Sequence, residues 1–378
     1  MSLHSTVDEL LVVDHHCHGV LRRDVDRTGF ESMLTEADEP GPLSPTLFDS
    51  QIGFAVRRWC APVLDLEPHA EPEAYLERRA DLGHEEVTRR FLCAAGTGTY
   101  LVDTGYVPEP ILEPSALAAA VDGEAFEIVR LEQVAEEVIA EGVHAAGFAD
   151  AVRERLAQRT AYAVGVKSIA AYRAGLDLPG EQPSESEVAA AAGRWLRATE
   201  AGATPRCSDP VLHSFLVWAG IDLAKPVQFH VGLGDSDTDL RRGDPLLLTP
   251  LLRATQARGI PIMLLHNYPY HRYAGYLAQV FGHVFLDLGL ATHNLGRGSA
   301  RVIAELLELA PFGKVLFSSD AFGLAELYHL GTLLFRRGLA EVLQAGVADG
   351  SWTEIDAERT AGMILAGNAI RAYRLDDA

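Results

Sequence analysis

The sequence predicts an α/β protein folded as a (β/α)8 TIM-type barrel, with a helical insertion after the first strand and extra C-terminal helices. From about residue 99 onward, short β-branched and aromatic runs alternate with longer helical patterns, the arrangement of βα units around a parallel sheet. An apolar run at 10–14 brings the number of expected strands to eight, the number that closes such a barrel. A chain of 378 residues is long enough for this fold with insertions.

The expected first strand, 10–14, leads directly into His16 and His18. Residues 19–98 do not continue the strand pattern, and helical periodicity occurs instead at 52–66 and 75–95. We interpret 19–98 as a helical cap that sits over the strand end and helps to shape a pocket. The other expected strands lie at 99–102, 126–129, 162–166, 227–229, 260–265, 284–286 and 314–317.

Alanine- and glutamate-rich stretches with helical periodicity separate the later strands. The tail, 325–373, predicts two or three further helices that pack outside the barrel. We find no linker and no internal repeat, so the sequence predicts one domain over 1–378. The helices between strands are expected at 131–158, 185–201, 210–219, 245–257, 273–281 and 300–309.

Composition and charge restrict the partners. The hydrophobic content of 48% with 22% charged residues is ordinary for a globular protein, and the net charge of −21 argues against nucleic acid and anionic membranes, which both attract basic surfaces. The four cysteines are far apart and form no CxxC motif, which fits a reducing compartment. No signal peptide or membrane-spanning run is visible. We therefore expect a cytoplasmic protein with a small-molecule substrate; homo-oligomerisation stays open.

Metal-compatible side chains follow the expected strands, at the end of the barrel where functional groups belong. Because side chains in a strand alternate, His16 and His18 point to one face and Cys17 to the other. The corresponding positions after the fourth, fifth, sixth and eighth strands hold Lys167, His230, His266 and Asp320. Imidazole and carboxylate groups bind divalent transition metals, so this convergence predicts a metal site, with zinc the default for hydrolysis and manganese, iron, nickel and cobalt as alternatives.

Each of these residues also has an ordinary structural role. His230 fits a buried, hydrogen-bonded histidine, His266 a turn cap, and Asp320 a helix N-cap. A lysine is normally protonated and ligates metals poorly, so Lys167 is either carbamylated by carbon dioxide or binds a substrate anion. Both roles of Lys167 stay open. The structural roles do not explain why all these residues come to one end of one barrel.

Cationic and hydrogen-bonding residues after the third, fourth and sixth strands are the expected substrate contacts. Because an arginine fork matches a carboxylate, they favour a small carboxylate-bearing substrate, although each arginine could equally form a surface ion pair. These residues are Arg130, Tyr172, Arg173, His271 and Arg272. The remaining histidines receive no role: His4, His15, His69, His84, His144, His213, His283, His293 and His329.

The order HxH, Lys, His, His and Asp over strands one, four, five, six and eight resembles the amidohydrolase superfamily. The segments Val164 to Ile169, Ala171 to Arg173 and His266 to Tyr270 are similar to the amidohydrolase-2 branch of FluG and nodulin-type proteins. The resemblance covers nearly the whole chain. In plants and fungi that branch is fused to a glutamine-synthetase-like domain, which these 378 residues do not include.

The resemblance implies that His16, His18 and Asp320 bind the more buried metal and that His230 and His266 bind or approach a second. In some branches the lysine at the position of Lys167 is carbamylated and bridges two metals. The implied reaction is hydrolysis of a C–N amide bond, in an N-acyl or γ-glutamyl amide, by a metal-activated water.

In that reaction Asp320 would move the proton of the water to the leaving amine, while His266 or His230 steadies the oxyanion; Asp320, His266 and Lys167 are thus the expected catalytic residues. Two alternatives stay open. One is a metal-dependent decarboxylase or lyase of the same superfamily, which a single metal and a free Lys167 would favour. The other is a non-catalytic barrel scaffold.

Overall fold

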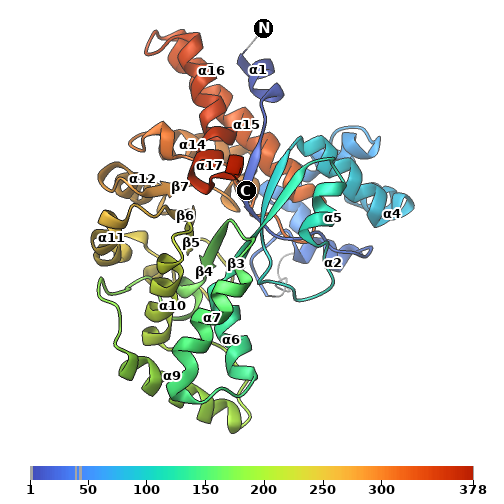
Figure 1. Cartoon of the computed structure of the whole chain (residues 1–378). Coiled ribbons are helices and arrows are strands. Elements are labelled where there is room, and N and C mark those ends of the chain that lie inside the picture. The colour runs from blue at the N-terminus through green and yellow to red at the C-terminus, as the bar shows by residue number, and fades with distance from the viewer. Residues whose placement is uncertain (1–2, 39–40, 42–44, 378) are drawn as a thin grey trace.

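The computed structural model describes residues 3–38, 41 and 45–377. Its centre is a parallel sheet in which the strands are paired in chain order, from β1 to β7 (Figure 1). Parallel neighbours joined by helical crossovers are the basic unit of a TIM-type α/β fold. The strands are β1 (Val13–Cys17), β2 (Thr99–Asp103), β3 (Glu124–Arg130), β4 (Gly165–Ser168), β5 (Val227–Val231), β6 (Ile262–His266) and β7 (Val284–Leu286).

Residues 315–317 lie between β7 and β1, where an eighth strand would be. Val315 forms an isolated parallel bridge with Leu286, and the Leu316 amide donates to the Leu286 carbonyl at 2.9 Å. On the other side, the His15 amide donates to the Phe317 carbonyl at 3.1 Å. The segment therefore connects the two edges of the sheet, although it is too short to be assigned as a full strand.

Helices surround the sheet (Figure 1), and none of those described has the length and apolar character needed to cross a membrane. They are α1 (Leu3–Glu9), α2 (Arg27–Ser32), α3 (Gln51–Ala55), α4 (Pro72–Ala95), α5 (Pro114–Ala119), α6 (Leu131–Ala140), α7 (Phe148–Arg159), α8 (Ala170–Arg173), α9 (Glu185–Glu200), α10 (Pro210–Asp222), α11 (Thr249–Thr255), α12 (His271–Val280), α13 (Ala291–Leu295), α14 (Ser299–Leu306), α15 (Ala325–Ala348), α16 (Glu354–Gly362) and α17 (Asn368–Tyr373).

Several expected boundaries were wrong, among them that of the fourth strand, which is Gly165–Ser168 and not 162–166. The first strand begins at Val13 and not at residue 10, because α1 ends at Glu9 and 10–12 form the connection from that helix to the strand. The helix expected over 131–158 is two helices, α6 and α7. Gly142 separates them with a φ of +79°, a left-handed conformation that favours glycine and ends a helix.

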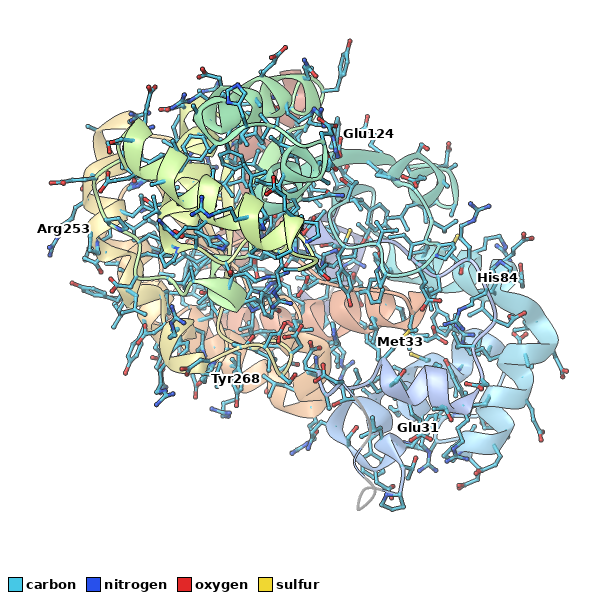
Figure 2. All side chains as sticks on the ribbon, turned by 90° about the horizontal axis from the view of Figure 1, so that it is seen from below. Glu31, Met33, His84, Glu124, Arg253 and Tyr268 are labelled. Atoms are coloured by element: carbon cyan, nitrogen blue, oxygen red, sulfur yellow. The ribbon has the colours of Figure 1, made fainter. Side chains whose placement is uncertain are left out.

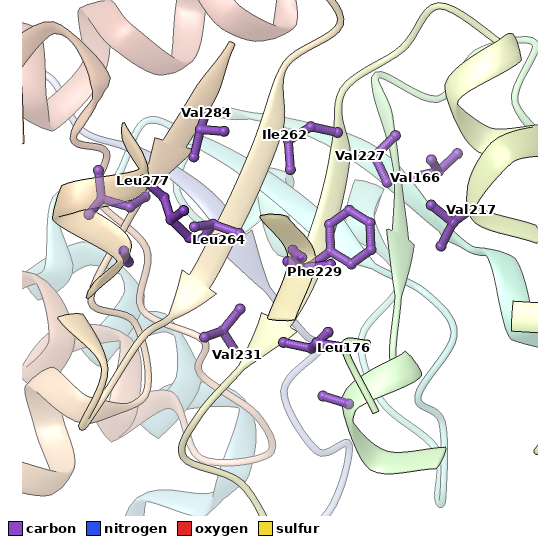
Figure 3. Close-up of a cluster of buried hydrophobic side chains, with 14 of the residues drawn as sticks. Val166, Leu176, Val217, Val227, Phe229, Val231, Ile262, Leu264, Leu277 and Val284 are labelled. Atoms are coloured by element: carbon purple, nitrogen blue, oxygen red, sulfur yellow. The ribbon is translucent and has the colours of Figure 1, made fainter. Parts of the chain in front are cut away.

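The main core lies between the strands and the outer helices. Outward-facing residues of β4 to β7, including Val166, Phe229 and Leu264, pack against residues of the covering helices such as Val217 and Leu277. Figure 3 shows these side chains gathered beside the sheet. This apolar layer fixes which face of each strand points outward, so the alternate residues must point into the barrel.

A second apolar cluster fills the inside of the barrel. Val13, Leu101 and Leu265, from three strands, pack with Tyr373 of α17 and with Ala366. The Tyr373 hydroxyl also lies 3.1 Å from His15 Nδ1 and accepts a hydrogen bond from Gln228 Nε2 at 2.8 Å. The C-terminal helix therefore closes the interior at the end opposite the strand termini that carry the functional residues.

The helices between β1 and β2 pack on α15 through their own apolar cluster, which includes Phe30, Tyr75, Phe91 and Leu330. Figure 2 shows Glu31 and Met33 in this N-terminal segment, beside α4 with its labelled His84. A buried ion pair joins the segment to α15: Arg79 Nε lies 2.8 Å from Glu326 Oε1. The Tyr75 hydroxyl donates to the same oxygen at 3.0 Å.

We predict that Arg79→Met destabilises the protein by about 3–5 kcal/mol, because it leaves the fully buried Glu326 carboxylate without its counter-charge. Arg89→Met is the matched control: Arg89 lies on the same helix, is 57% exposed and pairs with Glu86, so its loss should cost less than about 1 kcal/mol. Urea unfolding followed by circular dichroism measures both. Equal unfolding free energies for the two variants would contradict the prediction that loss of the buried Arg79–Glu326 pair costs more than loss of an exposed one.

Candidate metal centre

Strand alternation brings four polar side chains into the barrel above its apolar interior. Val102, Val129 and Val166 belong to clusters outside the barrel, so the residues that follow them face inward. Those residues are Asp103, Arg130 and Lys167, and Arg130 is paired with Lys167 in the register of β3 and β4. On β5, His230 lies between the outward-facing Phe229 and Val231. The ends of β2 to β5 thus supply an inward ring of polar side chains.

The position of His16 depends on an irregularity in β1. Val13 faces the interior and Cys17 lies in an outer cluster, and the register with β2 shifts between Asp14 and Cys17. Such a bulge changes the direction of the side chains that follow it. As a result, His15 contacts the interior residue Tyr373, and His16 next to it reaches Lys167, with 3.0 Å between Lys167 Nζ and His16 Nε2.

His266 and Asp320 reach the site through left-handed backbone conformations. Their φ angles are +67° and +51°, which costs a non-glycine residue on the order of 1–3 kcal/mol. Hydrogen bonds hold both: the His266 amide donates to Asp287 Oδ1 at 2.8 Å, and the Asp320 amide donates to the His16 carbonyl at 3.0 Å. Strain that the surroundings hold in place in this way is characteristic of functional sites.

His16, His18 and Asp320 form a three-residue group that could hold a metal. Their ligand atoms lie within 4.8 Å of one another, and this is the one such group among the residues that the structure describes. Asp320 Oδ1 is 3.1 Å from His16 Nε2 and 3.4 Å from His18 Nε2. His18 Nδ1 lies 3.3 Å from the Asp103 carbonyl; donating there, it leaves the Nε2 lone pair free to bind an ion.

The protonation states of this group also fit a divalent cation. Burial and the nearby charge of Lys167 lower the pKa of His16 to about 4, so its imidazole is neutral at pH 7. Burial opposes ionisation of Asp320, but His266, His16 and His18 hold the pKa of its carboxyl well below the usual value. Two imidazoles and a carboxylate facing one point are a donor set for a metal.

The other three predicted ligand residues surround the same point. His266 Nδ1 lies 3.1 Å from Asp320 Oδ2, and the ring of His230 is 4.7 Å from that of His266. Burial lowers the pKa of both histidines, that of His230 to about 3. Burial also lowers the pKa of Lys167, although Asp103 and Asp320 act in the opposite direction. The structure therefore brings together all six predicted metal-compatible residues.

A cavity of about 630 Å³ opens above these residues. Its wall includes two of the expected substrate contacts, Tyr172 and Arg173, and the Tyr172 ring lies 4.1 Å from the His230 ring. Arg173 Nε and Nη1 are buried and have no hydrogen-bond partner among the described residues. An unpaired guanidinium in a cavity is free to bind an anion.

The remaining expected substrate contacts differ in their placement. Arg130 lines the cavity, but its guanidinium already binds Asp103, with 2.6 Å between Nη2 and Oδ2. His271 and Arg272 are not brought to the site. They lie at the start of α12 and pair with acidic residues of α14 and its C-terminal end: His271 Nε2 is 2.8 Å from Glu305 Oε2, and Arg272 Nη2 is 2.9 Å from Glu308 Oε1. The helix begins directly after the loop and turns both side chains toward its neighbour.

Sequence reasoning missed three buried carboxylates next to the ligand residues, and two of them hold ligand residues directly. Asp14 accepts hydrogen bonds from the amides of His16, at 3.4 Å, and Ser319, at 2.9 Å. Asp103 binds Arg130, and Asp287 accepts from the amide of His266. Such partners orient metal ligands. Asp103 could have been found, because it is the last inward position of β2; Asp287 follows β7 in the same way.

Sequence and structure comparisons agree on the family. The family model described as Amidohydrolase matches residues 116–375. The chain is 34% identical over 225 residues to Protein fluG of Emericella nidulans, a match that covers 57% of this chain and 26% of that protein. The chain thus spans about a quarter of the length of this curated relative.

Among solved structures, a proposed metal-dependent hydrolase from Lactobacillus casei ATCC 334 is 32% identical, with a TM-score of 0.86 over 100% of this chain and 98% of that one. A uronate isomerase from Bacillus halodurans C-125 has a TM-score of 0.64 at 15% identity, covering 98% and 95% of the two chains; this shows a shared fold. The family model matches more than half of this chain, and the chain has the HxH pair, Asp320 and the barrel. It therefore belongs to the amidohydrolase-2 family of the metal-dependent amidohydrolase superfamily.

Proposed function

We propose that this protein is a metal-dependent hydrolase that cleaves the C–N amide bond of a small carboxylate-bearing substrate, such as an N-acyl or γ-glutamyl amide. The observation that carries the proposal is that the group of His16, His18 and Asp320 opens, through His18 and Asp320, into the cavity that also contains the unpaired guanidinium of Arg173. The first three supply a metal-binding group and a base. The last supplies a carboxylate anchor.

His16, His18 and Asp320 would hold the ion, with zinc as the proposed metal. A divalent ion in such a site makes water acidic near neutral pH and polarises a carbonyl. Asp320 takes the proton of the attacking water and later passes it to the leaving amine. The position of Oδ2, 3.1 Å from His266 Nδ1, lets His266 steady this carboxylate or the developing oxyanion, with His230 beside it.

Lys167 has two proposed roles. Burial favours its neutral amine, the form that reacts with carbon dioxide to give a carbamate, and the carbamate would be a carboxylate-like ligand for a second ion near His230 and His266. Alternatively, the protonated amine binds a substrate anion. Lys167 Nζ lies 3.0 Å from His16 Nε2, so a metal on that nitrogen would displace the direct contact in either case.

The helices of 19–98 would act as a cap. Met33 and Glu36, from the segment that follows α2, line the cavity together with Asp320. Closing the site with a separate segment excludes water and increases the strength of the electrostatic interactions inside. We propose that this cap, more than the barrel itself, restricts the substrate to a small molecule.

We predict that Arg173→Met raises KM for a carboxylate-bearing substrate by about 10²-fold, because a charge-assisted hydrogen bond is lost, while kcat changes less. The matched control is Arg241→Met, in the loop after β5, since Arg241 is 89% exposed and pairs with Asp239. The same substrate with its carboxylate converted to a primary amide should lose affinity for the wild type and not for Arg173→Met. If the wild type and Arg173→Met distinguish the carboxylate from the amide equally well, Arg173 does not bind the substrate carboxylate.

The decisive experiment combines metal analysis with a substrate panel. Protein purified without chelator is analysed for transition metals, then supplied with zinc or manganese and bicarbonate and assayed on N-acyl amino acids and γ-glutamyl amides. We expect at least one metal per chain and release of the amine. Less than about half an equivalent of metal, not restored by supplementation, would refute the enzyme proposal.

The same experiment separates the alternatives. Release of carbon dioxide from a substrate carboxylate, with one metal and an unmodified Lys167, would show that the protein is a decarboxylase and not a hydrolase. Metal binding without turnover of any panel member would favour a scaffold. Mass spectrometry of the native protein detects a carbamate on Lys167 as an added carbon dioxide.

A further inference from the structure

His293 lines the cavity, and none of the steps of the proposed reaction uses it. It lies on α13, the short helix that follows β7, and is 1% exposed. Its Nδ1 is buried without a hydrogen-bond partner in the described part of the chain. A buried histidine with an unpaired ring nitrogen at the wall of a cavity requires a reason, because unsatisfied polar groups cost free energy.

The two ring nitrogens of His293 face different surroundings. Nδ1 faces α15, since a Cβ atom added to Gly331 would lie 3.9 Å from it. Nε2 is not among the buried atoms without a partner, and none of the described residues makes a hydrogen bond to it, so it keeps contact with the open cavity. The Nδ1 side of the ring therefore faces the helix, and Nε2 is presented to a ligand.

The unequal surroundings determine the protonation of the ring. Burial lowers the pKa of His293 to about 4, so the ring is neutral at pH 7 and carries one N–H. A buried acceptor without a partner is tolerated better than a buried N–H without one. The proton consequently belongs on Nε2, which makes His293 a neutral hydrogen-bond donor directed into the cavity.

The backbone places this donor on the Asp320 side of the cavity. The amide of Leu290, three residues before His293, donates to the Ser319 carbonyl at 3.0 Å, and Ser319 directly precedes Asp320. Arg173, in contrast, follows β4, half-way around the sheet from the segment that carries Asp320. A substrate held by Arg173 through its carboxylate would extend its reacting bond toward Asp320 and His293.

We propose that His293 is a further catalytic residue, which donates a hydrogen bond from Nε2 to the substrate carbonyl oxygen at the bond being broken. This inference rests on the proposed hydrolase function and assigns one more contact in the same cavity. The carbonyl oxygen gains negative charge when water attacks, so a neutral donor fixed beside it binds the transition state more strongly than the substrate. The donor keeps its proton throughout, and the base remains Asp320.

The kinetic test uses two variants and a control. His293→Leu removes the donor and should lower kcat/KM by about 10²–10³-fold, mainly through kcat; His293→Gln keeps a side-chain N–H and should recover at least about a tenth of the wild-type value. His283→Gln is the control, because His283 is also a buried histidine with an unpaired Nδ1, and it bonds Thr255 outside the cavity. Metal content should be unchanged in all three. Wild-type kcat in His293→Leu would overturn the proposal.

A second measurement needs no substrate. In the chain labelled with ¹⁵N at histidine, at pH 7 and with and without zinc, the His293 signal is identified by its absence in His293→Gln. We expect the proton on Nε2; a proton on Nδ1 would overturn the proposal even if the protein proves to be a hydrolase. If the wild type hydrolyses no panel member, the proposed function fails, and this spectrum still decides whether His293 is the donor that the geometry requires.

Discussion

Asp320→Asn is expected to lower kcat by about 10⁴-fold or more, the upper end of what a general base contributes, because Asp320 both binds the metal and moves the proton. Asparagine has nearly the same shape, so its amide can keep the backbone conformation at φ +51°. Steady-state kinetics on the substrate found with the panel gives the loss, and circular dichroism shows that the fold is retained.

The informative comparison is with the neighbouring carboxylate Glu36, which lines the same cavity without binding the ligand residues. Glu36→Gln should change kcat by less than about 10-fold, since no proton transfer in the proposed reaction passes through it. Turnover by Asp320→Asn at a rate near that of the wild type would exclude a mechanism in which Asp320 is the base. Equal losses in both variants would mean that cavity charge, and not Asp320 itself, limits the reaction.

His18→Ala is expected to lose the metal and, with it, turnover. The imidazole supplies one of three ligand atoms, so its removal should weaken metal binding by more than the roughly 10–100-fold that removal of an outer partner costs. The backbone around it should survive, because the Tyr328 hydroxyl donates to the His18 carbonyl and not to its ring. Metal content after dialysis and the melting temperature measure the two effects separately.

His271→Ala provides the control for this variant. His271 is a buried histidine that pairs with Glu305 on α14 and lies outside the cavity, so its loss should leave metal content unchanged and affect stability alone. If His18→Ala retains a full equivalent of tightly bound metal, the group of His16, His18 and Asp320 is not the binding site. Loss of metal in both variants would instead indicate a general effect of destabilisation.

The strand-end residues could be predicted because a strand has a simple period. An apolar run that ends in a histidine, lysine or aspartate predicts both where the strand ends and which side chain lies at that end. His230 and Lys167 lie at the last positions of such runs, and parallel strands bring those positions to one edge whatever the helices between them do. Errors of two or three residues in a strand boundary, as at β1, do not move a side chain to the other end of the barrel.

Loop residues could not be placed in this way. His271 and Arg272 follow β6 as closely as Arg173 follows β4, yet they pair with Glu305 and Glu308 on and just after α14. His293 lies seven residues beyond the last residue of β7, and the sequence does not distinguish it from the other histidines in caps, helices and strand starts. Only the direction in which each loop leaves its strand, fixed by packing and by positive φ angles such as that of Leu290, decides which of these side chains faces the cavity.

The sequence by itself determined the order of the ligand-type residues along the barrel and the family to which that order belongs, because hydrophobic periodicity and residue identity are local properties of a chain. The tertiary structure decided what those residues do together: the bulge that turns His16 inward, the left-handed backbone that brings His266 and Asp320 to the same point, and the partners that leave Arg173 and His293 free. These depend on contacts between segments up to some three hundred residues apart, and no local pattern records which of them form.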